Sequence, residues 1–172
     1  MTRDLSYPIG KFDPTSYADR ATNTATIIDL PKGLAAAVKG LSDNQLDTPY
    51  RPGGWTVRQT VHHIADSHLN SVIRFKLALT EDATPTITPY QEDRWAELGD
   101  SKLPVDASLK MIDGIHTRWQ GLLASMSEDD YQKKFIHPES GEWTLERTLG
   151  LYAWHSKHHT AHITKLRERM SW

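Results

Sequence analysis

The 172-residue sequence contains no cysteine. Disulfide bonds and thiolate metal ligands are therefore excluded, and any metal ion would have to be held by imidazole, carboxylate or water. The sequence also has little net charge, because 20 Lys and Arg residues are balanced by 22 Asp and Glu residues to give a formal net charge of -2. This balance provides no basic excess, so DNA or RNA is not expected as a partner.

Long hydrophobic runs are also missing. No stretch approaches the length of a membrane span, and residues 1–14 carry charges without the apolar segment of a secretory signal. We therefore expect a soluble, cytoplasmic protein that has no membrane partner. Its length fits a single domain, residues 1–172, built around one hydrophobic core.

Four segments repeat apolar residues with the period of an amphipathic helix, at about residues 17–41, 57–80, 105–126 and 145–170. The first segment changes its apolar face across Pro31, so we expect a helix that is kinked or divided there. The two faces are Ala21, Ala25 and Ile28 before the proline, and Leu34, Val38 and Leu41 after it. Residues 1–15 are expected to form an extended arm on the surface.

The second helix has a clear start signal, because Thr56 and Gln59 have the spacing of a capping box. After this helix, the polar residues 81–104 form a connection longer than most in compact domains. We predict that this segment is a lid or a crossover, with a short helical turn near Trp95.

The two halves of the sequence resemble each other. Residues 53–61 (GGWTVRQTV) match residues 141–149 (GEWTLERTL), and residues 41–43 (LSD) match residues 126–128 (MSE). Both of the longer matches open helices that carry histidines. We therefore predict an all-α fold, a four-helix bundle in which two helical hairpins are related by a pseudo-twofold axis and joined by one long crossover connection.

Seven of the nine histidines fall in two short windows, one on the second predicted helix and one on the last. His155 and His159 are four positions apart, which places both imidazoles on one helix face where they can reach one metal ion. His162 could be a third ligand, a partner that orients a ligand, or a general base. Such a pair is also compatible with solvated or core histidines. The windows contain His62, His63 and His68, then His155, His158, His159 and His162.

A third ligand would come from the first window, and the periodicity leaves its identity open. His68 falls in the apolar stripe of its helix, whereas His63 lies about 240° from Val57 at about 100° per residue. His63 therefore shares a polar face that either meets water or lines a cleft. The polar residues on this face are Gln59, Asp66, Ser67, Asn70 and Arg74.

Several motifs resemble the DinB/YfiT superfamily of four-helix metalloproteins. They are Trp55-Thr56 before His63, the pair His155-x-x-x-His159, and the blocks 5–10 (LSYPIG), 46–51 (LDTPYR), 61–68 (VHHIADSH), 74–77 (RFKL) and 152–155 (YAWH). The likeness spans nearly the whole chain and is closest to the YfiT-like branch of bacterial metal-dependent hydrolases. It implies that the metal ligands are His63, His155 and His159, that the remaining histidines of the two windows are not ligands, and that the protein is a homodimer.

Three imidazoles accept several transition metals, including zinc, nickel, iron and manganese. We expect one divalent ion per chain, with zinc first and nickel as an alternative. Such an ion lowers the pKa of its water toward about 7, which predicts hydrolysis of a small-molecule substrate. It could instead ionise a low-molecular-weight thiol such as bacillithiol for transfer, or hold the helices together as a structural ion. Asp66, Asn70 and Arg74 are either substrate-contacting or solvated.

Overall fold

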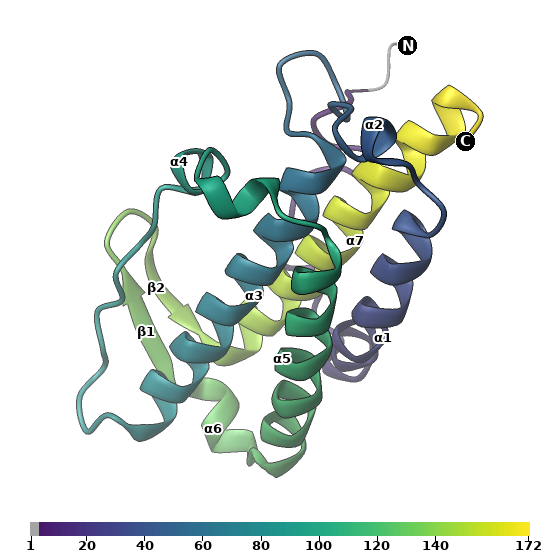
Figure 1. Cartoon of the computed structure of the whole chain (residues 1–172). Coiled ribbons are helices and arrows are strands. Elements are labelled where there is room, and N and C mark those ends of the chain that lie inside the picture. The colour runs from purple at the N-terminus through teal and green to yellow at the C-terminus, as the bar shows by residue number, and fades with distance from the viewer. Residues whose placement is uncertain (1–3) are drawn as a thin grey trace.

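The computed structural model describes residues 4–172, and four long helices form a bundle (Figure 1). The four helices are α1 (Arg20–Val38), α3 (Val57–Thr80), α5 (Asp106–Ser125) and α7 (Leu145–Met170). The predicted all-helical bundle is confirmed, and the last helix has the predicted bounds. One feature was not predicted. An antiparallel hairpin of β1 (Lys134–His137) and β2 (Gly141–Thr144) precedes α7, with Phe135 opposite Trp143.

Each half of the chain uses the same local signals before its histidine-bearing helix. The short helices α2 (Asp43–Leu46) and α6 (Glu128–Gln132) both begin with a capping box, at Ser42 and at Ser127. The long helices α3 and α7 then begin at threonine caps, because Thr56 Oγ1 accepts from the Gln59 N–H and Thr144 Oγ1 accepts from the Arg147 N–H. The sequence echo is therefore a structural repeat, with the caps of each unit at equivalent places.

The packing of the four long helices has the symmetry that the echo predicts. Helix α1 packs against α5 and α7, and helix α3 packs against the same two helices. Exchanging α1 with α5 and α3 with α7 leaves this pattern unchanged, as a pseudo-twofold axis requires. Helices of the first half thus alternate with helices of the second half, which brings the two histidine-bearing helices, α3 and α7, into contact.

The long connection after α3 is the predicted crossover. It runs back along the outside of the bundle, so that α3 and α5 run in the same direction (Figure 1). The connection includes α4 (Glu92–Trp95), which confirms the helical turn near Trp95, and a 3-10 helix, η1 (Gly99–Lys102). It is also fastened to the hairpin, because the Ile87 N–H donates to the Ile136 carbonyl at 2.9 Å and the Ile136 N–H donates to the Pro85 carbonyl at 2.8 Å.

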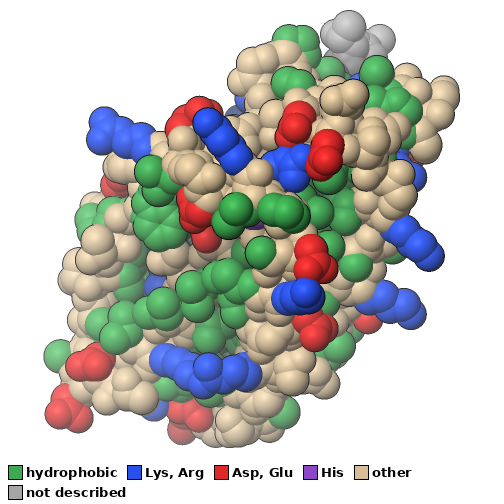
Figure 2. All heavy atoms as spheres, in the orientation of Figure 1, with side chains coloured by type: hydrophobic (Ala, Val, Ile, Leu, Met, Phe, Trp, Pro, Cys, Tyr) green, Lys and Arg blue, Asp and Glu red, His purple; other side chains and the backbone are tan. Residues whose placement is uncertain are grey.

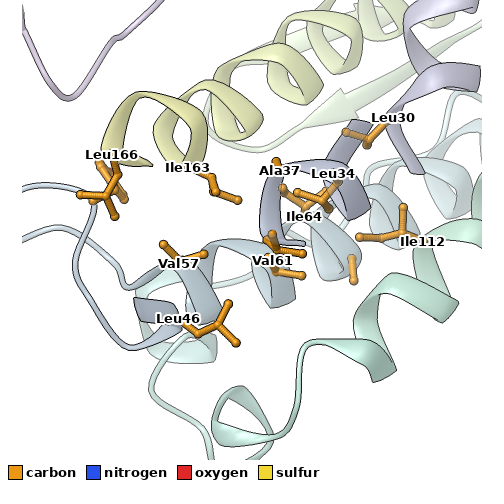
Figure 3. Close-up of a cluster of buried hydrophobic side chains, with 13 residues drawn as sticks. Leu30, Leu34, Ala37, Leu46, Val57, Val61, Ile64, Ile112, Ile163 and Leu166 are labelled. Atoms are coloured by element: carbon orange, nitrogen blue, oxygen red, sulfur yellow. The ribbon is translucent and has the colours of Figure 1, made fainter. Parts of the chain in front are cut away.

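All four long helices contribute to the hydrophobic core (Figure 3). Leu34 of α1, Val61 and Ile64 of α3, Ile112 of α5 and Ile163 of α7 are each fully buried in one cluster. Burial of this apolar surface is the main force that stabilises such a bundle. A second cluster lies around Trp119 at the end of the bundle nearer the hairpin.

Helix α1 continues through Pro31 without a break, so the prediction of a divided helix is wrong. The predicted face before the proline is also wrong, because Ile27 and Leu30 are buried there. The exposed residues are Ala21, Ala25 and Ile28. Proline has no N–H, so the helical hydrogen bond from residue 31 to the Ile27 carbonyl is missing. Packing on both sides of the proline keeps the helix continuous despite this loss.

The N-terminal arm, as far as the structure describes it, consists of turns packed on α7 rather than an extended strand. The Tyr7 N–H donates to the Asp4 carbonyl and the Gly10 N–H donates to the Tyr7 carbonyl. Trp154 Nε1–H of α7 donates to the Gly10 carbonyl at 3.1 Å. The arm therefore covers part of the histidine-rich helix. Residues 1–3 of the predicted arm lie outside the described residues.

Positive and negative side chains are interspersed on the face seen in Figure 2, in keeping with the small net charge. Within residues 4–172, none of the helices has both the length and the apolar character needed to cross a bilayer.

Candidate metal centre

Three histidines from two helices converge at the contact between α3 and α7. One ring nitrogen from each of His63, His155 and His159 lies within 4.8 Å of the other two. The Nε2 atoms of His63 and His155 are 3.2 Å apart. His155 and His159 lie one turn apart on α7, with ring centroids separated by 4.4 Å. The structure thus brings together the three histidines that the resemblance implied as ligands.

The geometry of these histidines fits one transition-metal ion. Two imidazole nitrogens bound to the same zinc ion lie about 3.3 Å apart, because each is about 2.0–2.1 Å from a tetrahedral centre. The observed 3.2 Å between the Nε2 atoms of His63 and His155 agrees with that separation. Three imidazoles without a carboxylate suit zinc, nickel, copper or iron better than magnesium or calcium.

The three histidines are neutral at pH 7, as metal ligands must be. Burial is the largest cause and lowers the pKa of His63 to about 4, with a smaller contribution from His162. Burial also lowers the pKa of His155 and that of His159 well below the usual value, and the neighbouring histidines lower both further. Each ring therefore keeps one nitrogen lone pair free for a metal ion.

A cavity of about 410 Å³ opens beside the three histidines. This volume is typical of small-molecule sites. The crossover, the hairpin and the N-terminal arm all contribute side chains to its wall, together with α3 and α7. The lining residues other than the three histidines include Tyr7, Arg74, Glu92, His137, Trp143 and Trp154. On another side, the Trp55 ring contacts the His63 ring with centroids 4.5 Å apart.

The polar residues that were predicted to share the face of His63 occupy different environments in the structure. Arg74 lines the cavity. Asn70 donates its side-chain amide to the Asp66 carbonyl within the same helix. Asp66 does not line this cavity, and burial, reinforced by the nearby Asp100, raises its pKa to about 6. Of the three residues whose roles the sequence left open on this helix, only Arg74 is positioned to contact a substrate.

The remaining histidines of the first window point elsewhere. His62 faces the crossover, where its Nε2–H donates to the Leu103 carbonyl at 3.0 Å and its Nδ1 lies 2.7 Å from Ser108 Oγ. His68 is fully buried and does not line the cavity, so the apolar stripe that favoured it describes core packing. These positions agree with the implication of the resemblance that neither is a ligand.

A second histidine group, His158, His159 and His162, also has ring nitrogens within 4.8 Å of one another. It is a poorer cation site for two reasons. His162 stacks on Tyr50 at 3.9 Å and donates from Nε2 to the Ser6 carbonyl. Burial is the largest cause of the lowered pKa of His162, and the guanidinium groups of Arg51 and Arg169 lie close enough to lower it further by charge; the same positive charge repels a cation.

A larger cavity, of about 680 Å³, lies between α2, the start of α3 and the crossover. Its one buried charged side chain, Arg58, already has partners. Arg58 is buried and pairs with Asp43 at 2.8 Å and with Asp47 at 2.7 Å. This arrangement is structural, so the cavity beside the three histidines is the better candidate for a functional site.

Several residues of the candidate site were not found from the sequence. Tyr7, Glu92, His137 and Trp143 reach the cavity from the arm, the crossover and the hairpin. Glu92 is the one carboxylate among these four residues. Although the residue as a whole is exposed, partial desolvation at the cavity wall raises the pKa of its carboxyl group, with a smaller contribution from Asp93. Tyr7 and Trp143 lie within motifs noted in the sequence, residues 5–10 and 141–149, but those motifs did not indicate that either side chain reaches a cavity. For Glu92, the only signal in the sequence was the unusual length of the connection that contains it.

Acid is expected to unfold the metal-free protein. Three buried histidines have lowered pKa values, and burial is the largest cause for each. The pKa is about 4 for His116, about 3 for His158 and about 4 for His162. An unfolded histidine has a pKa of about 6.5. Below that pH the unfolded chain binds protons that the folded chain does not, so the free energy of unfolding falls by about 1.4 kcal/mol per pH unit for each such histidine.

The measurement is the thermal midpoint of chelator-treated protein between pH 7 and pH 5, which we expect to fall steadily. Asp66 has the opposite effect on stability. Its pKa is raised in the folded state, so as the pH falls the folded chain binds this proton before the unfolded chain does, which stabilises the fold. An Asp66→Asn variant should therefore lose stability more steeply over the same range. A midpoint that stays constant from pH 7 to pH 5 would show that the buried histidines do not control acid stability.

Comparison with known proteins agrees with this description. A family model described as the DinB superfamily matches residues 28–163. A relative from Bacillus mycoides (strain KBAB4), named "putative metal-dependent hydrolase", is 58% identical over 176 residues and covers 99% of each chain. A relative of the same name from Bacillus cereus (strain B4264) is 59% identical over 172 residues, covering 98% of this chain and 99% of that one.

A solved structure also matches. YfiT from Bacillus subtilis, described as a probable metal-dependent hydrolase with an unusual four-helix bundle topology, is 49% identical. It superimposes with a TM-score of 0.92 and covers 98% of each chain.

Proposed function

Because the chain belongs to the DinB superfamily, we propose that it is a metal-dependent hydrolase whose ion is held by His63, His155 and His159. The observation that carries the proposal is the convergence of three neutral imidazoles from two helices on the wall of a cavity. Three protein ligands leave coordination positions for water or substrate, which is the arrangement of catalytic rather than structural sites. The names of the relatives agree with this activity.

A bound divalent ion would supply a coordinated water with a pKa near about 7, available as a nucleophile at neutral pH. Zinc is the expected ion, with nickel as the alternative, because both accept three imidazoles. The protein's part is to hold the ligands in position. The Trp55 ring covers the His63 ring on one side and stacks near His159, and so limits the access of bulk water to both ligands there.

Two charged residues on the cavity wall are suited to act on the substrate. The Arg74 guanidinium carries a permanent positive charge that can bind a carboxylate or polarise a carbonyl oxygen. The Glu92 carboxyl has a raised pKa, so it can exchange a proton closer to neutral pH than an exposed glutamate. We assign substrate binding to Arg74 and proton transfer to Glu92.

The test combines elemental analysis with assays of stripped and reloaded protein. Purified protein should contain about one zinc or nickel ion per chain. It should cleave members of a panel of p-nitrophenyl esters and p-nitroanilides. Treatment with a chelator should abolish cleavage, and zinc or nickel should restore it.

Two outcomes would overturn the hydrolase proposal. In the first, the metal-loaded protein cleaves nothing in the panel but conjugates bacillithiol to an electrophile, which indicates thiol transfer. In the second, the protein retains metal and is inactive in both assays, which indicates a structural ion.

A further inference from the structure

A continuous series of hydrogen bonds runs from one candidate metal ligand into the protein core. His155 Nδ1 lies 3.1 Å from His68 Nε2, and His68 Nδ1 lies 2.9 Å from His116 Nε2. His116 Nδ1 lies 2.6 Å from the backbone carbonyl oxygen of Ile27. His68 is 0% exposed and His116 is 2% exposed, so water does not compete for these bonds. We call His155, His68 and His116 the histidine relay.

The carbonyl at the end of the relay sets the direction of every bond. A carbonyl oxygen only accepts, so His116 must donate from Nδ1, and a neutral His116 then offers a lone pair at Nε2. His68 must therefore donate from Nδ1 and accept at Nε2. His155 must in turn donate from Nδ1, which leaves its Nε2 lone pair directed toward His63 and the candidate metal site.

This direction holds only if each relay histidine carries one proton. A doubly protonated His68 would place an N–H against the N–H of a neighbour. His68 is 0% exposed and His116 is 2% exposed, and within residues 4–172 their hydrogen-bond partners are imidazoles and a carbonyl rather than carboxylates. A buried ring without a counter-ion stays neutral, because a buried charge is costly unless it is paired. The three rings therefore have three protons for three hydrogen bonds.

Pro31 explains why the Ile27 carbonyl is available deep in the bundle. In an uninterrupted helix, this carbonyl would accept from the N–H of residue 31. Proline has no N–H, so that helical bond is missing from α1. The carbonyl is buried between helices and needs a donor, which His116 of α5 supplies. Pro31 thus leaves the Ile27 carbonyl free to accept from His116, the last histidine of the relay.

We propose that His68 and His116 are positioning residues that fix His155 in the tautomer whose Nε2 lone pair faces the metal ion. This inference rests on the proposed metal site. The other tautomer would place a proton at Nε2 and block coordination. Hydrogen bonds to the outer nitrogen of a metal-bound histidine generally orient its ring and raise its basicity.

The relay makes His155 different from its neighbour on the same helix. His159 Nδ1 is buried and has no hydrogen-bond partner in residues 4–172. The His159 ring is held instead by packing, including the nearby Trp55 ring. Of these two candidate ligands on α7, His155 is therefore the one whose outer nitrogen is fixed by a hydrogen bond.

The tautomers can be measured directly on metal-free protein labelled with ¹⁵N. Two-dimensional NMR spectra that correlate the ring nitrogens with the ring carbon-bound protons distinguish a protonated Nδ1 from a protonated Nε2. We expect Nδ1–H and an unprotonated Nε2 for His155, His68 and His116. A protonated Nε2 on His68 or His155 would overturn the proposal, and this measurement does not depend on metal binding or activity.

Metal affinity supplies the second test. His116→Leu removes both the acceptor for His68 and the donor for Ile27, so affinity for zinc, measured by competition with a chromophoric chelator, should fall by about 10-fold or more. His116→Gln should keep most of the affinity, because one amide group can accept from His68 and donate to the carbonyl. Equal affinities in wild type, His116→Leu and His116→Gln would overturn the proposal.

A matched control comes from His62, which is also buried and hydrogen-bonded but lies outside the relay. His62→Gln should leave zinc affinity unchanged. Should His116→Leu fail to fold, the NMR spectra of the wild type and His116→Gln still decide the question. A wild-type protein that binds no metal would refute the proposed function, whereas the spectra would still test the relay.

Discussion

A His155→Ala variant is expected to lose zinc affinity by more than about 100-fold, because even the partners that orient a ligand contribute about 10- to 100-fold. His155 is a proposed ligand whose Nε2 lies 3.2 Å from His63 Nε2, and it is the one held by the relay. Its removal leaves two imidazoles, too few for a stable site. Hydrolase activity should be lost in parallel. Chelator competition and elemental analysis measure the first effect.

His162→Gln is the matched control for this variant. His162 lies on the same helix and belongs to the second histidine group, but it does not line the cavity. The variant should therefore bind zinc as tightly as the wild type. If His162→Gln loses the metal and His155→Ala keeps it, the ion occupies the second group and the proposed site is wrong.

A Trp119→Ala variant is expected to lose about 3–5 kcal/mol of unfolding free energy, the usual cost of removing a large buried aromatic side chain. Trp119 is fully buried in the second core cluster. Its ring contacts Phe75 at 5.4 Å, His116 at 5.7 Å and Tyr152 at 5.7 Å between centroids. The loss is a large share of the stability of a typical domain. Denaturant unfolding measured by circular dichroism gives the change.

Trp119→Phe separates the volume of the side chain from its polarity. Trp119 Nε1 is buried without a hydrogen-bond partner in the described part of the chain, so its removal costs no hydrogen bond. The phenylalanine variant should lose less than half as much stability as the alanine variant. Equal losses in the two variants would mean that the unpaired N–H is paired in solution, or that this cluster is not well packed.

The sequence alone determined the four long helices and their order. The start of a helix depends on residues that are close together in the sequence. A capping box needs only two residues three positions apart, so Thr56 and Gln59 indicated where α3 begins. The repeat of Trp-Thr predicted that two histidine-bearing helices begin in the same way, and the structure places caps at Thr56 and Thr144. The length of the connection after α3 predicted the crossover, since parallel neighbouring helices need a long return.

The sequence was less informative about helix faces. A helical wheel for α3 placed His68 in the core and His63 on a polar face, and it could not distinguish water from a cleft. The polar face proved to be covered, because α7 packs against it and leaves His63 only 5% exposed. Resemblance to a family, rather than periodicity, identified His63. In α1 the pattern was misleading, because Ala21, Ala25 and Ile28 share a face that meets solvent.

Only the tertiary structure revealed the relay and the cavity. His68 and His116 are 48 positions apart in the chain, and His116 and Ile27 are 89 apart. A contact of this kind depends on how helices pack, and no periodicity within one helix reports it. Caps and turns are set by neighbours in the chain, so they can be read from the sequence. The tautomer of His155 is set by a carbonyl that Pro31 exposes on another helix, so it needed the fold.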